Sequence, residues 1–349
     1  MAAVVAPQGT IGPTESEAML RGFGRAKAVM SGIELGVYDA LADGALTPEE
    51  LARRLSLPTA SLRRLLIYLC SIGLLEKRAD AYANTPSTAL HLVSDQPTFM
   101  GGNVGHLSHD LYPLWNHLTD AIREDSNRRP QAFPGRDHEP FGAAFNDPVV
   151  LRETLSAMTA NTTPVATELA RRFDFGSRRC LLDVGSAFAT LPIIVLTVHP
   201  QLSGISFDLP VVGPLAEESI ADAGLADRLR VASGDMFADP LPPGADVITL
   251  SMILHDWDDE RCLLILERCH AALADGGAIL VLEGLMNDEG TGPDRTAWGS
   301  LNMLVATDGG RERSAGEYFA LLARAGFVRP AVLLFTVPSA RHCVVAWKA

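Results

Sequence analysis

His255, Glu283 and Glu312 are the side chains of this sequence best suited to acid–base chemistry. A histidine with its ordinary pKa of about 6.5 can take a proton from a phenol or an enol at neutral pH. His255 follows a predicted strand at residues 246–251, and Glu283 ends the next predicted strand. We therefore expect His255 to act as a general base whose tautomer is fixed by Glu283 or Glu312. The alternative is that His255 caps a helix and that Glu312 lies in a solvated loop.

Acidic side chains stand at the ends of three further predicted strands. They are Asp183, Asp208 and Asp235. Ligands of a doubly wound sheet bind at the carboxyl ends of its strands. Asp208 is placed to accept hydrogen bonds from a ribose diol, and Asp235 to pair with an exocyclic amine, with Met236 and Phe237 covering an adenine face. Taken singly, such an acid is as often a helix cap or a surface residue, and Met236 and Phe237 would by default belong to the core.

The stretch LLDVGSAFATLP, residues 181–192, begins like a nucleotide-binding turn and then departs from it. Gly185 is present, but Ser186, Ala187 and Ala189 stand where further glycines would let the backbone close on a ligand. The chain has no GxxxxGK[ST] loop, and a turn with a single glycine suits a pyrophosphate poorly. The pattern favours a nucleoside ligand without phosphates, and S-adenosylmethionine fits that description.

The elements that must position these residues form an alternating pattern from residue 179 onward. Continuous apolar strands that alternate with amphipathic helices predict an α/β fold with a Rossmann-like, doubly wound parallel sheet. The expected strands are residues 180–184, 203–208, 229–233, 246–251 and 278–283, followed by a helix at 314–325 and strands at 331–337 and 342–347.

The N-terminal part has the outline of a mainly α winged-helix domain. Thr47 and Glu50 form a capping box, residues 61–75 carry a helical apolar stripe, and LLEKRADAYANT supplies the two strands of a wing. A winged helix can read DNA, but the helix that would do so offers only Arg63 and Arg64, and the chain has a net charge of −13. We expect a dimer-forming role and no nucleic-acid partner.

Length and composition set further bounds. A chain of 349 residues with 47% hydrophobic and 20% charged residues is globular and suits two domains. The negative charge disfavours an anionic membrane surface, and no apolar run approaches the roughly 20 residues that span a bilayer. No secretory signal is visible, so we expect a cytoplasmic protein that does not bind membranes.

Four stretches together resemble the caffeate-type small-molecule O-methyltransferases, including the bacterial enzymes that tailor polyketides and antibiotics. They are FDLP, GDMF, LHDWDDERCLLILERCHAAL and LNMLVATDGGRERSAGEYFALLARAGF. The resemblance covers nearly the whole chain. It implies a winged-helix dimerisation domain at residues 1–100, a helical linker at 101–175 that contributes to the substrate pocket, and a catalytic domain at 176–349.

The resemblance also implies roles for individual residues. His255 would deprotonate the acceptor hydroxyl, and Glu283 and Glu312 would hold it. No metal is expected, and the cofactor would be S-adenosylmethionine. Its expected contacts are Asp183, Gly185, Ser186, Asp208, Leu209, Asp235, Met236, Phe237 and Ser251. The pocket of the small-molecule acceptor is expected to be lined by His106, His109, Trp115, Met158, Asn161, Thr162, Met252, Trp298, Asn302 and Met303, although ordinary packing would explain most of these equally well.

The departure from the family pattern D-x-G-G-G-x-G leaves two functions open. The first is methylation of an aromatic or enolic hydroxyl of a small secondary metabolite by a homodimer. The second is a repurposed enzyme that performs hydroxylation, decarboxylation, dehydration or a pericyclic step, with the cofactor structural or absent. Ser186, Ala187 and Ala189 motivate the second, since side chains there stiffen the loop and take up space. A non-enzymatic DNA-binding regulator is a third, disfavoured by charge.

Overall fold

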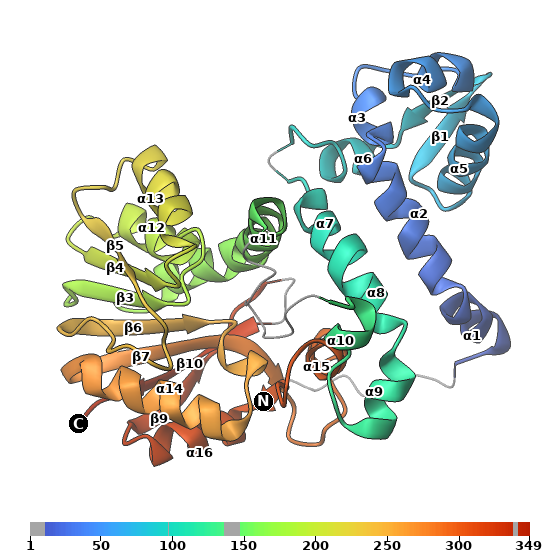
Figure 1. The fold of residues 1–349 in the computed structure, drawn as a ribbon. Coiled ribbons are helices and arrows are strands. Elements are labelled where there is room, and N and C mark those ends of the chain that lie inside the picture. The colour runs from blue at the N-terminus through green and yellow to red at the C-terminus, as the bar shows by residue number, and fades with distance from the viewer. Residues whose placement is uncertain (1–10, 97, 136–146, 338–340) are drawn as a thin grey trace. The chain divides into compact units, whose positions relative to one another are not determined.

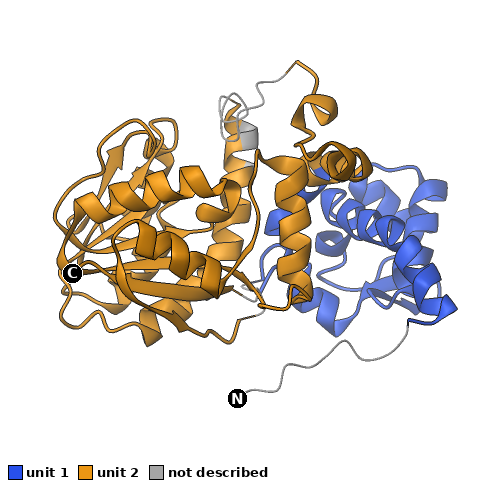
Figure 2. Ribbon diagram, turned by 90° about the horizontal axis from the view of Figure 1, so that it is seen from below, with its two compact units in different colours: residues 1–108 blue, residues 109–349 orange. Residues whose placement is uncertain are grey.

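The computed structural model describes residues 11–96, 98–135, 147–337 and 341–349 of the chain. The chain forms two compact units, residues 1–108 and residues 109–349 (Figure 2). Residues 136–146 of the linker expected at 101–175 lie outside the described residues. Among the described residues, no helix combines the length and the apolar character that a membrane span requires.

The first unit is mainly α-helical with one hairpin (Figure 1). Its elements are α1 (Pro13–Leu20), α2 (Gly22–Glu34), α3 (Val37–Ala40), α4 (Pro48–Leu55), α5 (Thr59–Ser71), β1 (Leu75–Arg78), β2 (Ala81–Asn84), α6 (Pro86–His91), η1 (Gly101–Asn103) and α7 (Val104–His106). The capping box is confirmed, because Thr47 Oγ1 accepts from the Glu50 backbone N–H and Glu50 Oε2 from that of Thr47. The helix that carries the apolar stripe ends at Ser71, and Gly73 breaks the helical pattern as expected, with a φ of 82° that turns the chain into β1.

The second unit contains the doubly wound sheet together with most of the remaining helices. The strands are β3 (Cys180–Val184), β4 (Ser203–Asp208), β5 (Leu229–Ser233), β6 (Ala245–Ser251), β7 (Leu273–Met286), β8 (Arg313–Ser314), β9 (Val328–Leu333) and β10 (Arg341–Trp347). The helices are α8 (Tyr112–Trp115), α9 (Leu118–Glu124), α10 (Arg129–Ala132), α11 (Pro148–Arg172), α12 (Thr190–Val198), α13 (Gly213–Asp222), η4 (Leu254–Asp256), α14 (Asp259–Ala272), α15 (Asp294–Ala306) and α16 (Ala315–Arg324). The helical turn η2 (Leu107–Leu111) spans the boundary of the two units.

The sheet has the strand order β5-β4-β3-β6-β7-β10-β9, and β8 pairs with the end of β7. Strands β3 to β7 are parallel, whereas β10 is antiparallel to both β7 and β9. The last two strands were predicted at 331–337 and 342–347. The first of them ends early, because the register of β9 with β10 stops at Leu333 and the N–H of Phe335 bonds to the His342 ring instead.

Two apolar layers cover the sheet (Figure 1). Helices α14 and α16 bury Ile265, Leu266 and Leu321 against one face, together with Val281 of β7. Helices α11, α12 and α13 cover the other face, where Leu282 of β7 is buried. Because neighbouring residues of a strand point to opposite faces, Glu283 continues the α14 side of β7 at the carboxyl end of the sheet.

Candidate functional site

His255 lies in the short turn η4, directly after β6, and only 8% of it is exposed. Its Nδ1 atom is 3.0 Å from Glu312 Oε1 and 3.5 Å from Glu283 Oε2. An ionised carboxylate can only accept a hydrogen bond, so Nδ1 must carry the proton toward Glu312. The structure thus brings together the three residues that the sequence singled out, and Nε2 is left as the ring nitrogen able to accept a proton.

Glu283 is completely buried and holds the backbone of the His255 turn. Its Oε1 accepts the N–H groups of Ile253 at 3.0 Å, Leu254 at 2.9 Å and His255 at 3.4 Å. Three convergent N–H donors stabilise a carboxylate and fix the chain that carries it. Glu283 therefore determines the position of the turn, whereas Glu312 determines the orientation of the ring. The residues alone suggested either of them as the partner of the histidine, and the family resemblance implied that both hold it.

Asp256 is a third buried carboxylate beside His255, and the sequence analysis did not select it. Its Oδ1 lies 3.6 Å from His255 Nε2, which is too far for a hydrogen bond. Its position next to the histidine in HDWDD could have indicated this proximity. The three carboxylates place His255 in a strongly negative environment.

This environment shifts the pKa values of the cluster. Burial by itself would lower the pKa of His255, but the charges of Glu283, Asp256 and Glu312 raise it well above 6.5. Burial raises the pKa of Asp256 to about 6, although the nearby His255 acts in the opposite direction. Burial also raises the pKa of Glu283. The cluster therefore binds protons near neutral pH as a coupled group.

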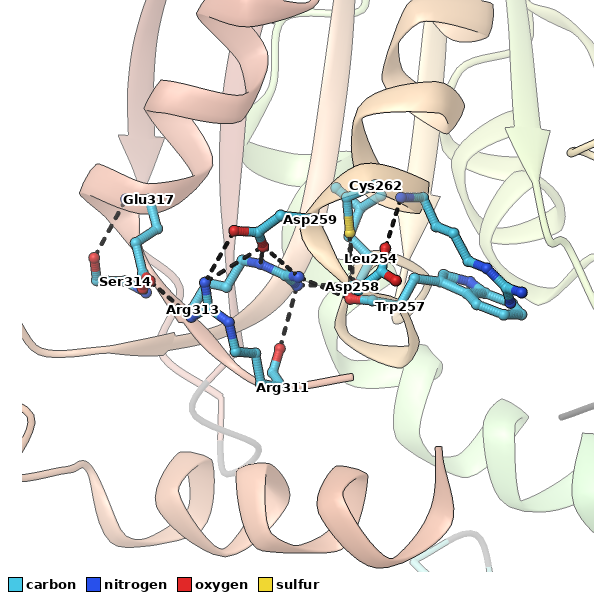
Figure 3. A network of polar contacts seen from close by, with 10 residues as sticks. Leu254, Trp257, Asp258, Asp259, Cys262, Arg311, Arg313, Ser314 and Glu317 are labelled. Carbon is cyan, nitrogen blue, oxygen red and sulfur yellow. Dashed lines mark hydrogen bonds and ion pairs between the residues drawn. The ribbon is translucent and has the colours of Figure 1, made fainter. Parts of the chain in front are cut away.

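Arg313 clamps the same turn through its main-chain carbonyls (Figure 3). This side chain is fully buried, and its Nη1 donates to Leu254 O at 2.9 Å while Nη2 donates to Trp257 O at 2.7 Å. Its Nε donates to Asp259 Oδ1 at 2.9 Å, at the start of α14. Arg313 follows Glu312 directly, so two neighbouring residues hold the turn, one through the ring and one through the backbone. Arg313 was not among the residues singled out from the sequence.

Two glycines leave room for the Glu312 side chain. A Cβ atom at Gly299 of α15 would lie 2.9 Å from Glu312 Oε1, and one at Gly284 of β7 would lie 3.0 Å from Glu312 Oε2. Both distances are shorter than an ordinary contact, so a larger residue at either position would displace the carboxylate. Glycine at 284 and 299 is thus part of how Glu312 reaches His255.

The glycine-poor loop after β3 adopts a left-handed backbone at three positions. Gly185 has a φ of 73°, and a Cβ atom there would lie 2.3 Å from Ile253 Cδ1. Ala187 and Ala189 have φ values of 51° and 57°. Alanine in this region costs roughly 1–2 kcal/mol per residue. The chain therefore keeps the backbone path that glycine favours and carries the strain of two alanines.

Contacts around this loop hold it in that path. Asp208 Oδ2 accepts the Ala187 N–H and its Oδ1 accepts the Leu209 N–H, both at 2.7 Å. Ala187 and Phe188 also pack against an apolar cluster that contains Leu155 of α11. Asp208 and α11 thus offset part of the strain in the loop.

The remaining cofactor candidates lie at neighbouring strand ends, as expected. Asp183 is buried and accepts a 2.6 Å hydrogen bond from Thr249, and its burial raises its pKa to about 7. The Met236 side chain approaches Gly185, which joins the ends of β3 and β5. Asp235 Oδ1 accepts the Phe237 N–H at 2.8 Å. Ser251 ends β6, beside Leu282 of β7.

The substrate candidates come from several elements of the chain. Trp115 and Trp298 stack with ring centroids 5.4 Å apart, and Trp115 Nε1 donates to Asn302 Oδ1 at 3.0 Å. Met303 is buried on the same helix as Asn302. Met158, Asn161 and Thr162 lie on α11. Met252 precedes η4, His109 lies in η2, and His106 belongs to the first unit.

Comparison with known proteins agrees with the fold. Residues 115–328 match the O-methyltransferase domain family, and residues 18–94 match the O-methyltransferase dimerisation domain. The chain therefore belongs to the S-adenosylmethionine-dependent O-methyltransferase family, which includes natural-product tailoring enzymes.

Two curated relatives and two solved structures illustrate the similarity. The chain is 37% identical to the 3-hydroxy-5-methyl-1-naphthoate 3-O-methyltransferase of Streptomyces sahachiroi, over 97% of this chain and 96% of the relative. It is 32% identical to the tetracenomycin polyketide synthesis 8-O-methyl transferase TcmO of Streptomyces glaucescens, over 90% and 91%. PigF of Serratia sp., solved with SAH, has a TM-score of 0.90 at 31% identity over 97% of this chain and 100% of PigF. Human N-acetylserotonin methyltransferase, solved with SAM, has a TM-score of 0.89 at 27% identity over 99% of each chain.

The clamp formed by Arg313 yields a first prediction. We expect Arg313→Lys to lower kcat by about ten- to a hundredfold, because one ammonium group cannot bond both carbonyls and Asp259 at once. The KM for S-adenosylmethionine should change little. Steady-state kinetics of Arg313→Lys and Arg311→Lys test this, since Arg311 binds the same Asp259 from an exposed position. Equal kinetics in the two variants would contradict the clamp.

Proposed function

We propose that this protein transfers a methyl group from S-adenosylmethionine to a hydroxyl group of a small aromatic or polyketide-like metabolite, with His255 as general base. The observation that carries the proposal is the buried His255 whose Nδ1 bonds to Glu312 and whose Nε2 makes no hydrogen bond with a described residue. The named acceptors of the two bacterial relatives, a hydroxynaphthoate and a tetracenomycin polyketide, support this acceptor class.

The residues at the strand ends fit the cofactor. Both oxygens of Asp208 already accept one backbone N–H, and each retains capacity for a second hydrogen bond, as a ribose diol requires. Ser186 Oγ is buried beside Asp183 and lowers the pKa of that carboxyl, so it stands among the polar groups at the end of β3. We assign Asp208, Ser186, Asp235, Met236 and Phe237 to cofactor binding. The bound cofactor supplies the electrophilic methyl group.

Within this proposal His255 handles the proton of the acceptor. Its Nε2 takes the hydroxyl proton, and the imidazolium that forms is stabilised by the carboxylates of Glu312 and Glu283. Nδ1 keeps its proton throughout, because Glu312 accepts from it. Glu283, by holding three backbone N–H groups, keeps the ring at a fixed height above the sheet.

The same three side chains have a spacing that a metal ion could use. The ligand atoms of His255, Glu283 and Glu312 lie within 4.8 Å of one another. We favour proton transfer without a metal, because Nδ1 bonds directly to Glu312 and Oε1 of Glu283 is already engaged by the turn. We further propose a cytoplasmic homodimer formed through the dimerisation domain at residues 18–94.

A second candidate function is supported by the loop after β3. Ala187 and Ala189 occupy left-handed conformations and bring methyl groups to positions where a glycine would have none. Such a loop suits an enzyme that uses His255, Glu283 and Glu312, the proton-handling cluster, for another reaction, such as hydroxylation, decarboxylation, dehydration or a pericyclic step. Formation of S-adenosylhomocysteine in step with the product separates the two candidates, since only methyl transfer releases it.

Cofactor binding is the most direct test. We expect isothermal titration to detect S-adenosylmethionine binding to the full chain, and Asp208→Asn to weaken it by about tenfold or more through loss of a charged acceptor. Asp222→Asn, an exposed position at the end of α13, is the matched control. If no heat is detected with the unaltered protein, the second candidate function is favoured.

The role of His255 predicts a large loss of turnover. His255→Ala should lower methylation of an acceptor such as 3-hydroxy-1-naphthoate by about a hundredfold or more. Binding of S-adenosylmethionine should persist. Release of S-adenosylhomocysteine measures the rate, and His91→Ala in the first unit is the control. Near-normal turnover by His255→Ala would remove His255 from the mechanism.

The acidic surroundings of His255 predict a particular pH dependence. The carboxylates raise the pKa of His255 to about 10, so the neutral ring, which is the base, forms only as the pH rises toward that value. We expect kcat/KM to increase with pH through a midpoint above 6.5. Glu312→Gln removes one negative charge and should move that midpoint down by about one unit. The exposed Glu260→Gln should leave it in place; an upward shift in Glu312→Gln would contradict the assignment.

A further inference from the structure

Arg341 occupies the first position of β10, beside the proton-handling cluster. It pairs with Gly284 of β7, one residue beyond Glu283. Alternate residues of a strand share a face, so Arg341 points to the same side as Cys343 and Val345, both of which are buried in the layer covered by α11. The chain thus directs a cation from β10 toward α11 at the carboxyl end of the sheet.

The hydrogen bonding of this cation is incomplete. Arg341 Nη1 donates to the main-chain oxygen of Asn161 on α11 at 3.3 Å. In the part of the chain that the structure describes, no other acceptor is found for Arg341, and no carboxylate lies within ion-pair distance of it. A guanidinium has five N–H donors in a planar fork that matches a carboxylate. Most of these donors remain available to a ligand.

Arg295 is a second cation of this region without an ion pair among the described residues. It lies in the first turn of α15, four residues before Gly299, and therefore on the helix face that covers Glu312. Burial lowers the pKa of Arg341, Glu283 and Glu312 raise it, and Arg295 lowers it further. The like charges of Arg295 and Arg341 are thus close enough to repel each other.

Two neighbouring cations that form no ion pair among the described residues are unusual in a chain of net charge −13, although Glu283 and Glu312 act on Arg341 from beyond ion-pair distance. In the absence of a ligand, their repulsion and the partial burial of Arg341 are unfavourable. An anion between them would relieve both. Asn161, whose main-chain oxygen accepts from Arg341, is among the residues that the family resemblance implies for the acceptor pocket, so we assign the anion to the acceptor.

We propose that Arg341, with Arg295 at the rim, binds a carboxylate group of the acceptor, which makes the substrate a hydroxyarene carboxylic acid. This inference rests on the proposed function, because it places the acceptor beside His255. The carboxylate pairs with the guanidinium of Arg341, and the hydroxyl on the same ring system is then directed toward His255. Arg341 determines which acceptors bind and takes no part in the proton transfer.

Binding measurements without turnover test the proposal. Isothermal titration of the full chain, saturated with S-adenosylhomocysteine, compares 3-hydroxy-1-naphthoate with its neutral primary amide. We expect the acid to bind at least about tenfold more tightly. Arg341→Met should weaken binding of the acid by about ten- to a hundredfold and change binding of the amide by no more than about twofold. The affinity of Arg341→Lys for the acid should lie between those of the unaltered protein and Arg341→Met. Arg295→Met should weaken the acid's binding less, because Arg295 is exposed.

Controls and outcomes separate this inference from the methylation proposal. Arg324→Met removes an exposed charge at the end of α16 and should change the affinity for neither ligand. Equal binding of acid and amide to the unaltered protein, or equal weakening of both in Arg341→Met, would overturn the inference. If the acid binds through Arg341 but no methylated product forms with S-adenosylmethionine, the carboxylate site stands and the methylation proposal fails. Should Arg341→Met not fold, Arg341→Lys and Arg341→Gln provide the same comparison.

Discussion

The hydrogen bond between His255 and Glu312 is the interaction on which the site depends. It is made in a buried environment, where a charged pair is strong when complete and costly when one partner is lost. Several other features serve this contact: Gly284 and Gly299 give the carboxylate room, and Arg313 holds the backbone on which the ring is mounted. The catalytic geometry is therefore a product of packing and main-chain hydrogen bonding as much as of the reacting groups.

The cofactor side of the site is organised by a different constraint. There the chain must follow a left-handed path through Ala187 and Ala189. The two N–H bonds of Asp208 and the apolar contacts of Phe188 hold that path. Asp208 consequently has two roles that depend on each other: it shapes the loop, and it is the proposed acceptor for a ribose. In the proposed function, loop strain and cofactor affinity are linked through this carboxylate.

Much of the fold followed from sequence periodicity, because strands such as β3 (CLLDV) and β6 (ADVITLS) are short, mainly apolar segments that alternate with helices. The positions of His255, Glu283 and Asp208 at or just after the ends of predicted strands also marked them as candidate site residues. The partners Arg313, Gly299 and Arg341 could not be found this way. Their contacts join segments far apart in the chain, and a lone arginine or glycine carries no local signal for such a contact. The end of β9 was misplaced for a similar reason, since it depends on pairing with β10.

The proton-handling cluster is drawn entirely from residues 255–312, whereas the acids proposed to bind adenosine come from residues 183–235. The two halves of the chemistry thus occupy consecutive, non-overlapping stretches of the polypeptide. Recombination with a homologue at a crossover between them, in the β5–β6 connection, would exchange one intact half without dividing the His255–Glu283–Glu312 contacts. This arrangement offers a natural breakpoint for chimaeric enzymes and for the shuffling of such chains in evolution.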